Sequence, residues 1–177
     1  KGDEEIFREF FEEEMSWYSF TTPSEEDFEI SSSGAKMVKA YNDIRALGAQ
    51  NIGDVAELSH GRDLGCPRPD FLEFVARWTI WKRETGNRQH NDYIAYVRKH
   101  GLVPRRLVAD EEESDRLKVL VIDEFQDLSP LQYEVYTMWR DSGSIDRIII
   151  AGDAAQSIYG FNGANPDYLV RTHADET

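Results

Sequence analysis

The chain has 177 residues, enough for one ordinary domain or two small ones, and 40% of them are hydrophobic, which is sufficient for a packed core. No apolar run approaches the roughly 18 residues of a membrane span, no signal peptide opens the chain, and the single cysteine excludes an internal disulfide and an all-cysteine metal cage. A reducing, cytoplasmic setting is therefore expected.

The net charge of −14 is unfavourable for binding nucleic acid, because phosphate contacts are normally made by clustered basic residues. Residues 31–110 are the basic section of the chain, with 13 basic and 9 acidic groups. Arginine (14) outnumbers lysine (6), and 34 acidic residues outnumber both together. This bias suggests, as a hypothesis, a halophilic source in which an acidic surface keeps the protein in solution.

The first 112 residues are predicted to be mainly helical. Apolar residues at helical spacing, with glycines after their ends, predict helices over 3–20, 35–47, a short stretch from about 52, 69–85 and 92–100. Asn91 is predicted to be the N-cap of the last of these. Residues 21–34 and 61–69 are predicted to be connecting segments.

The helix over 69–85 carries the clearest amphipathic pattern. Its apolar stripe consists of Phe71, Phe74, Val75, Trp78 and Trp81. Such a stripe is typical of a helix packed in a core. A platform on which nucleic-acid bases stack is the alternative interpretation.

The second part of the chain begins with a strand that runs directly into two carboxylates. Val119–Ile122 is a short apolar run without alternation, which predicts a parallel strand buried on both faces. Asp123 and Glu124 follow at its C-terminal end, the edge where open α/β sheets bind ligands. One carboxylate of such a pair can hold hydrated Mg²⁺ while the other polarises a water molecule.

A helix and a second strand are predicted after this acidic pair. Ser129, Pro130 and Gln132 form an N-cap, a first-turn proline and a capping-box partner. The predicted apolar face of that helix consists of Leu131, Val135, Met138 and Trp139. The second strand, Ile148–Ala151, ends in Gly152 and Asp153, so a right-handed βαβ unit brings both strand ends to one edge.

Two segments resemble motifs of a known family. Residues 121–128 (VIDEFQDL) closely resemble the Walker B segment, motif II, of UvrD/Rep-type superfamily 1 DNA helicases, and residues 151–164 (AGDAAQSIYGFNGA) resemble motif III. The resemblance implies an α/β fold in which residues 113–177 are part of a RecA-like P-loop NTPase core. A mainly helical inserted subdomain, residues 1–112, would precede it.

The resemblance also implies roles for individual side chains at an ATP site. Asp123 would hold Mg²⁺ through water, Glu124 would be the general base, and Gln156 would sense the γ-phosphate of ATP. Gln126 would belong to the nucleotide site and link it to motif III. The structural alternatives are that the two acids cap a strand end, that Gln156 closes a loop, and that Asp153 supports either the Mg²⁺ shell or only a turn.

The end of the second motif implies a nucleic-acid site. Tyr159 and Phe161 match aromatic residues on which the family stacks bases of single-stranded DNA. Asn162 occupies a position where the family usually has arginine, so a backbone-binding cation is missing there. Duplex junctions and repair proteins are the further partners that the resemblance implies.

The phosphate-binding loop of such an enzyme is not found in this sequence. No Gly-x-x-x-x-Gly-Lys-Ser/Thr segment occurs, so we expect a fragment that is inactive alone and belongs to a DNA helicase of repair or replication. The start at Lys1 rather than methionine agrees with that expectation. The alternatives are the helicase part of a helicase–nuclease and a non-catalytic module that binds DNA or protein.

Overall fold

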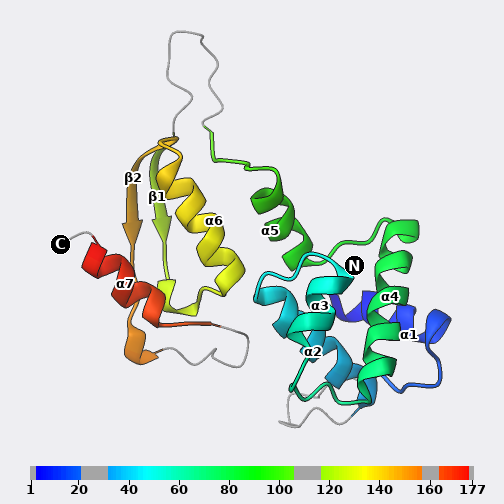
Figure 1. Ribbon diagram of the computed structural model, residues 1–177. Coiled ribbons are helices and arrows are strands. Elements are labelled where there is room, and N and C mark those ends of the chain that lie inside the picture. Colours follow the sequence, from blue (N-terminus) through cyan, green and yellow to red (C-terminus); the bar gives the residue numbers. More distant parts are fainter. Residues whose placement is uncertain (1–2, 21–31, 106–116, 157–163, 176–177) are drawn as a thin grey trace. The chain divides into compact units, whose positions relative to one another are not determined.

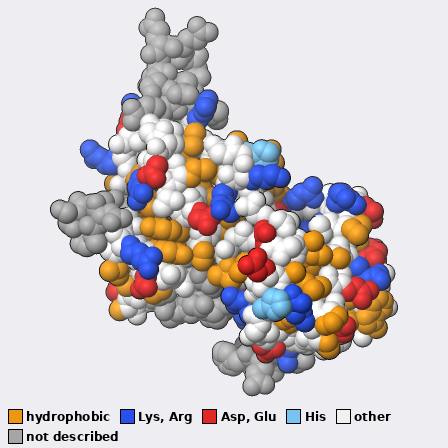
Figure 2. Space-filling model, in the orientation of Figure 1, with side chains coloured by type: hydrophobic (Ala, Val, Ile, Leu, Met, Phe, Trp, Pro, Cys, Tyr) orange, Lys and Arg blue, Asp and Glu red, His pale blue; other side chains and the backbone are white. Residues whose placement is uncertain are grey.

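The computed structural model describes residues 3–20, 32–105, 117–156 and 164–175, which fall into two compact units (Figure 1). One unit comprises residues up to 45 together with 49–91, and the other comprises 46–48 and the residues from 92 onward. Hydrophobic and charged side chains are interspersed over the face shown in Figure 2. Among the described residues, no helix is long and apolar enough to cross a membrane.

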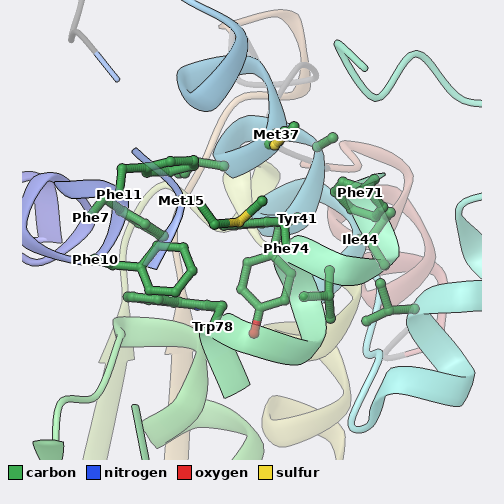
Figure 3. Close-up of a cluster of buried hydrophobic side chains, with 14 of the residues drawn as sticks. Phe7, Phe10, Phe11, Met15, Met37, Tyr41, Ile44, Phe71, Phe74 and Trp78 are labelled. Atoms are coloured by element: carbon green, nitrogen blue, oxygen red, sulfur yellow. The ribbon is translucent and has the colours of Figure 1, made fainter. Parts of the chain in front are cut away.

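The first unit is helical and is built around an aromatic core (Figure 3). Its helices are α1 (Asp3–Glu14), α2 (Ser33–Ala46), α3 (Ile52–Leu58) and α4 (Arg68–Thr85). The fully buried Trp78 of α4 stacks on Phe7 at 4.5 Å between ring centroids and meets Phe10 edge-to-face at 5.0 Å. The prediction that the aromatic stripe of this helix packs in a core is therefore confirmed, and the stripe offers no face for stacking bases.

Two helix boundaries differ from the predictions. α1 ends at Glu14 rather than near residue 20, and Tyr18 donates a hydrogen bond to Asp70 at the start of α4, which holds the chain after α1 in a turn. The next helix, α5 (His90–Lys99), begins at His90, so Asn91 lies within its first turn and is not the N-cap. Gly86 ends α4 in the left-handed conformation (φ 76°), as predicted.

The second unit contains a strand–helix–strand arrangement. Strands β1 (Leu117–Ile122) and β2 (Ile145–Ile150) pair in parallel, from Leu117 opposite Ile145 to Ile122 opposite Ile150. The connecting helix α6 (Pro130–Asp141) starts with the predicted capping box. These predictions are confirmed, and the described chain is mostly helical with a two-stranded parallel sheet, which is less than a complete RecA-like core.

The prediction that β1 is buried on both faces is wrong for this chain. Leu120 and Ile122 are partly buried on one face, whereas Val119 (45% exposed) and Val121 (62%) point to the other. Ile149 of β2 lies opposite Val121 and is 45% exposed. The reason is that α6, on one side of the strands in Figure 1, covers only one face of the sheet.

Helix α5 continues into the α/β unit rather than ending the helical one. Trp139 of α6 donates its indole N–H to the carbonyl oxygen of Leu102 at 2.8 Å, and Arg98 forms an ion pair with Glu134. The compact units therefore divide between Asn91 and Asp92. The domain boundary predicted at residue 112 lies outside the described residues, and the assignment of an inserted subdomain to 1–112 stays a prediction.

Candidate functional site

The candidate site lies where the two parallel strands end. Beyond the last paired residues, the Ala151 amide donates to the Ile122 carbonyl at 2.9 Å, and the Phe125 amide donates to the Ala151 carbonyl at 3.0 Å. These two bonds continue the strand pairing past β1 and β2. They hold the segment carrying Asp123 and Glu124 against the segment that starts with Gly152.

A sharp turn presents the two acidic residues. Glu124 has φ 51° and ψ 42°, and it is the one non-glycine residue with positive φ in the part of the chain that the structure describes. This left-handed conformation costs about 1–2 kcal/mol for a residue with a Cβ atom. The Asp123 carboxylate accepts a hydrogen bond from the Glu124 amide at 2.9 Å, which supports the turn. Both side chains are exposed and accessible to a ligand.

The turn is anchored by the short helix η1 (Phe125–Asp127). Phe125 is fully buried and meets Tyr136 of α6 edge-to-face at 4.8 Å between ring centroids. Burying this ring fixes the start of η1 against α6. The strained conformation of Glu124 is thus held by packing directly beside it.

Gln126 connects the two strand ends. Its side chain is 1% exposed, and its amide nitrogen donates to Glu124 Oε2 at 2.6 Å. Its amide oxygen accepts from the backbone N–H of Asp153 at 3.0 Å. A Cβ atom at Gly152 would lie 2.3 Å from that oxygen, so the absence of a side chain there allows Gln126 to reach across.

The loop after β2 holds the second amide. Asp153 accepts hydrogen bonds from the Ala155 amide at Oδ1 and from Gln156 Nε2 at Oδ2, both at 2.9 Å. The short helix η2 (Ala154–Gln156) follows, and Asp153 and Gln156 are exposed. The structure therefore brings Asp123, Glu124, Gln126 and Gln156 to one edge of the sheet.

The segment after motif III returns to this edge. The Asn165 amide donates to the Leu128 carbonyl at 3.2 Å, and helix α7 (Asp167–Asp175) contacts η1 and η2 (Figure 1). Tyr168 of α7 stacks on Tyr133 of α6, with ring centroids 3.9 Å apart and planes 4° from parallel. Tyr159, Phe161 and Asn162, the predicted nucleic-acid site, lie outside the described residues.

The donor groups at this edge suit a hydrated magnesium ion. Mg²⁺ retains several waters and is typically held by one or two carboxylates together with substrate phosphates. Asp123 and Glu124 provide such a pair. Among the described residues, no three His, Cys, Asp or Glu side chains gather closely enough to hold a metal ion by themselves. Any Mg²⁺ here would thus depend on water and phosphate for the rest of its shell.

Sequence reasoning missed two features of this site. Gly152 was placed only at the end of a strand, although its lack of a side chain is what Gln126 requires. Helix α7 was not predicted, although Asn165 and Pro166 before an apolar run are a recognisable helix start. The strand-end acids and Gln156 were found through the resemblance.

Comparison with known proteins agrees with the motifs. The model of the UvrD/REP helicase N-terminal domain matches residues 70–176, more than half of the chain. ATP-dependent DNA helicase UvrD2 of Mycobacterium tuberculosis is 45% identical over 60 residues, which cover 34% of this chain and 8% of that protein. ATP-dependent DNA helicase Rep of Escherichia coli is 35% identical over 79 residues, covering 42% of this chain and 11% of Rep.

A third relative is an ATP-dependent helicase/nuclease protein of Lactobacillus johnsonii, 35% identical over 68 residues, which cover 38% of this chain and 6% of that protein. The matched stretches amount to about a tenth or less of the length of these three relatives. The match to the family model, together with both motifs at one sheet edge, shows that the chain belongs to the UvrD/Rep helicase N-terminal domain family.

Proposed function

We propose that this chain supplies the motif II and motif III side of the ATP site in a longer ATP-dependent DNA helicase. That protein would translocate on single-stranded DNA and unwind duplexes in repair or replication. The observation that carries the proposal is the series of hydrogen bonds from Glu124 through Gln126 and Asp153 to Gln156. It joins the candidate general base to the candidate phosphate sensor, the two groups that ATP hydrolysis must coordinate.

Two carboxylates act first in this proposal. Asp123 would hold the hydrated ion through its exposed carboxylate, and Glu124 would orient and deprotonate the attacking water. Mg²⁺, when bound, would bridge the phosphates of ATP and neutralise their charge. The left-handed turn at Glu124 directs the two side chains from consecutive positions, so both can serve the same nucleotide.

The buried amide of Gln126 would act as a positioning group, because both of its ends are bonded within the protein. Gln156 bonds Asp153 in this structure, and its amide can instead donate to a phosphate oxygen. Such an exchange would release the Asp153 carboxylate. Since the Asp153 amide bonds Gln126, the change would reach Glu124 through a single side chain.

The DNA side of the proposal depends on motif III. Tyr159 and Phe161 would stack bases of the single strand, and Asn162 would contribute a weaker contact than the usual arginine. Duplex junctions and repair proteins are proposed as partners of the longer protein. The chain itself contains no phosphate-binding loop, and we propose that it neither hydrolyses ATP nor unwinds DNA by itself.

A helicase–nuclease is the second candidate, and the match to the helicase/nuclease protein of Lactobacillus johnsonii favours it specifically. Both candidates use the same ATP site, so they differ in whether the longer protein also cleaves DNA. A non-catalytic module remains the alternative from another class. It predicts that the longer protein lacks a phosphate-binding loop.

The test is Glu124→Gln in the longer protein that carries this chain, with the exposed Glu57→Gln of α3 as the matched control. We expect DNA-stimulated ATP turnover to fall by about 10²–10⁴-fold, the contribution of a general base. Nucleotide binding should stay within about twofold, because the same shape is kept. Unchanged turnover would remove Glu124 as the base, and cleavage of DNA by the wild-type protein would identify the helicase–nuclease.

A further inference from the structure

A groove lies in the helical unit, between the end of α1 and the outward face of α4. Its volume is about 400 Å³. The lining residues are Glu14, Glu73, Ala76, Arg77, Ile80, Trp81 and Glu84. All of them belong to one compact unit, so the groove is defined without reference to the rest of the chain. Its size is that of a ligand or peptide pocket.

The floor of the groove is apolar. Ile80 is 47% exposed there, and the edge of the otherwise buried Trp81 lies beside it. The indole N–H of Trp81 donates to Glu13 Oε2 at 2.8 Å, which fixes the orientation of the ring. Single exposed hydrophobic side chains are ordinary on this protein, as Figure 2 shows, but here they floor a concave site.

The rim of the groove is acidic. Glu14, Glu73 and Glu84 line it, and Arg77 is the one cation among the lining residues. Arg77 already has partners, because it pairs with Glu73 at 2.9 Å and with Glu14 at 3.8 Å, and its guanidinium lies 5.4 Å from the centre of the Trp17 ring. The groove therefore presents more negative charge than it neutralises.

We propose that this groove binds a short extended segment of a partner protein, in which arginine or lysine side chains alternate with aliphatic ones. The distance along α4 from Glu73 to Glu84, roughly 16 Å at the rise of a helix, accommodates about five extended residues. The stems of the cationic side chains would cover Ile80 and Trp81, and their heads would reach the carboxylates. The acidic rim repels phosphate, which argues against nucleic acid as the occupant.

A hexapeptide of alternating leucine and arginine, blocked at both ends, is the probe. We would titrate it into the ¹⁵N-labelled 177-residue chain and follow the Trp81 indole N–H and the amide of Ile80. The test variant is Ile80→Ser with Glu84→Gln. The matched control is Ile52→Ser with Glu57→Gln, because Ile52 is 46% exposed against 47% for Ile80, and both glutamates are exposed.

We expect saturable shifts at Trp81 and Ile80, at least tenfold weaker binding by the test variant, and binding within twofold of wild type by the control. A surface ion pair contributes up to about fivefold, so the apolar contact must supply the rest. The proposal is overturned if wild type shows no saturable shift up to about 1 mM peptide. It is equally overturned if both variants weaken binding alike, if a leucine–glutamate peptide binds as well, or if oligothymidylate shifts the same resonances.

Discussion

Replacing Gly152 with alanine tests whether Gln126 must cross between the strand ends. The new Cβ atom would lie 2.3 Å from Gln126 Oε1 and 3.1 Å from the backbone nitrogen of Phe125. The first distance is far inside van der Waals contact. Because the Gln126 side chain is 1% exposed, it has no free space into which to move. It must give up its bond to the Asp153 amide, its bond to Glu124, or both.

The expected loss follows from these contacts. Overpacking of a filled site typically costs about 1–3 kcal/mol, and one lost hydrogen bond adds about 1 kcal/mol. A glycine-to-alanine change recovers about 0.4–1 kcal/mol, because it restricts the unfolded chain. We therefore expect Gly152→Ala to lower the free energy of unfolding of the α/β unit by about 1–3 kcal/mol.

Amide hydrogen exchange of β1, β2 and Asp153 is the assay, since it reports the opening of this unit separately from the helical one. A double-mutant cycle with Gln126→Ala isolates the contact. Removing the glutamine side chain removes the clash, so Gly152→Ala should cost less than about 0.5 kcal/mol in that background. Additive losses would refute the reasoning, and so would a Gly152→Ala chain as stable as wild type.

Three further predictions concern stability. The hydrogen bond to Asp70 raises the pKa of Tyr18 to about 12. Its stabilisation should be complete below the ordinary tyrosine pKa of about 10 and be lost as the pH rises from 10 to 12; denaturation of wild type and Tyr18→Phe across that range should converge. Ser129→Ala removes the N-cap of α6 and should cost about 1 kcal/mol, measured by hydrogen exchange of the α6 amides, whereas Ser129→Asp should retain most of the stability. If the acidic composition reflects adaptation to salt, the melting temperature should be higher in molar than in dilute salt, and a salt-independent melting temperature would contradict that hypothesis.

Elements with strong local signals could be predicted from the sequence. The spacing of Phe71, Phe74 and Trp78 specifies one buried helix face, and the structure buries all three completely. Ser129 and Gln132 satisfy each other within one turn of the chain, so their pairing needs no tertiary information. These predictions succeeded because the causes lie within a few residues of one another.

The connection between the strand ends could not be predicted in the same way. Gln126 and Gly152 are separated by a helix and a strand, and they meet only because β1 and β2 pair in one particular register. A slip of the register would place a different residue against the amide oxygen. The stacking of Tyr168 on Tyr133 depends likewise on the chain returning to η1. The participants in these contacts can be read from the sequence, whereas the tertiary pairing determines that they meet.

The exposed face of the sheet has a different origin. Val119, Val121 and Ile149 belong to apolar runs that fit a sheet covered on both faces, yet the described residues cover one face with α6 and leave these three side chains 45–62% exposed. Exposed apolar surface is unfavourable by about 25 cal/mol per Å², so a two-stranded sheet standing alone would gain nothing from valine and isoleucine on its open face. Alternating polar residues would serve such a sheet better. The pattern that made the local prediction wrong therefore supports the family assignment, because two-sided apolar strands are what a larger α/β core with helices on both faces requires.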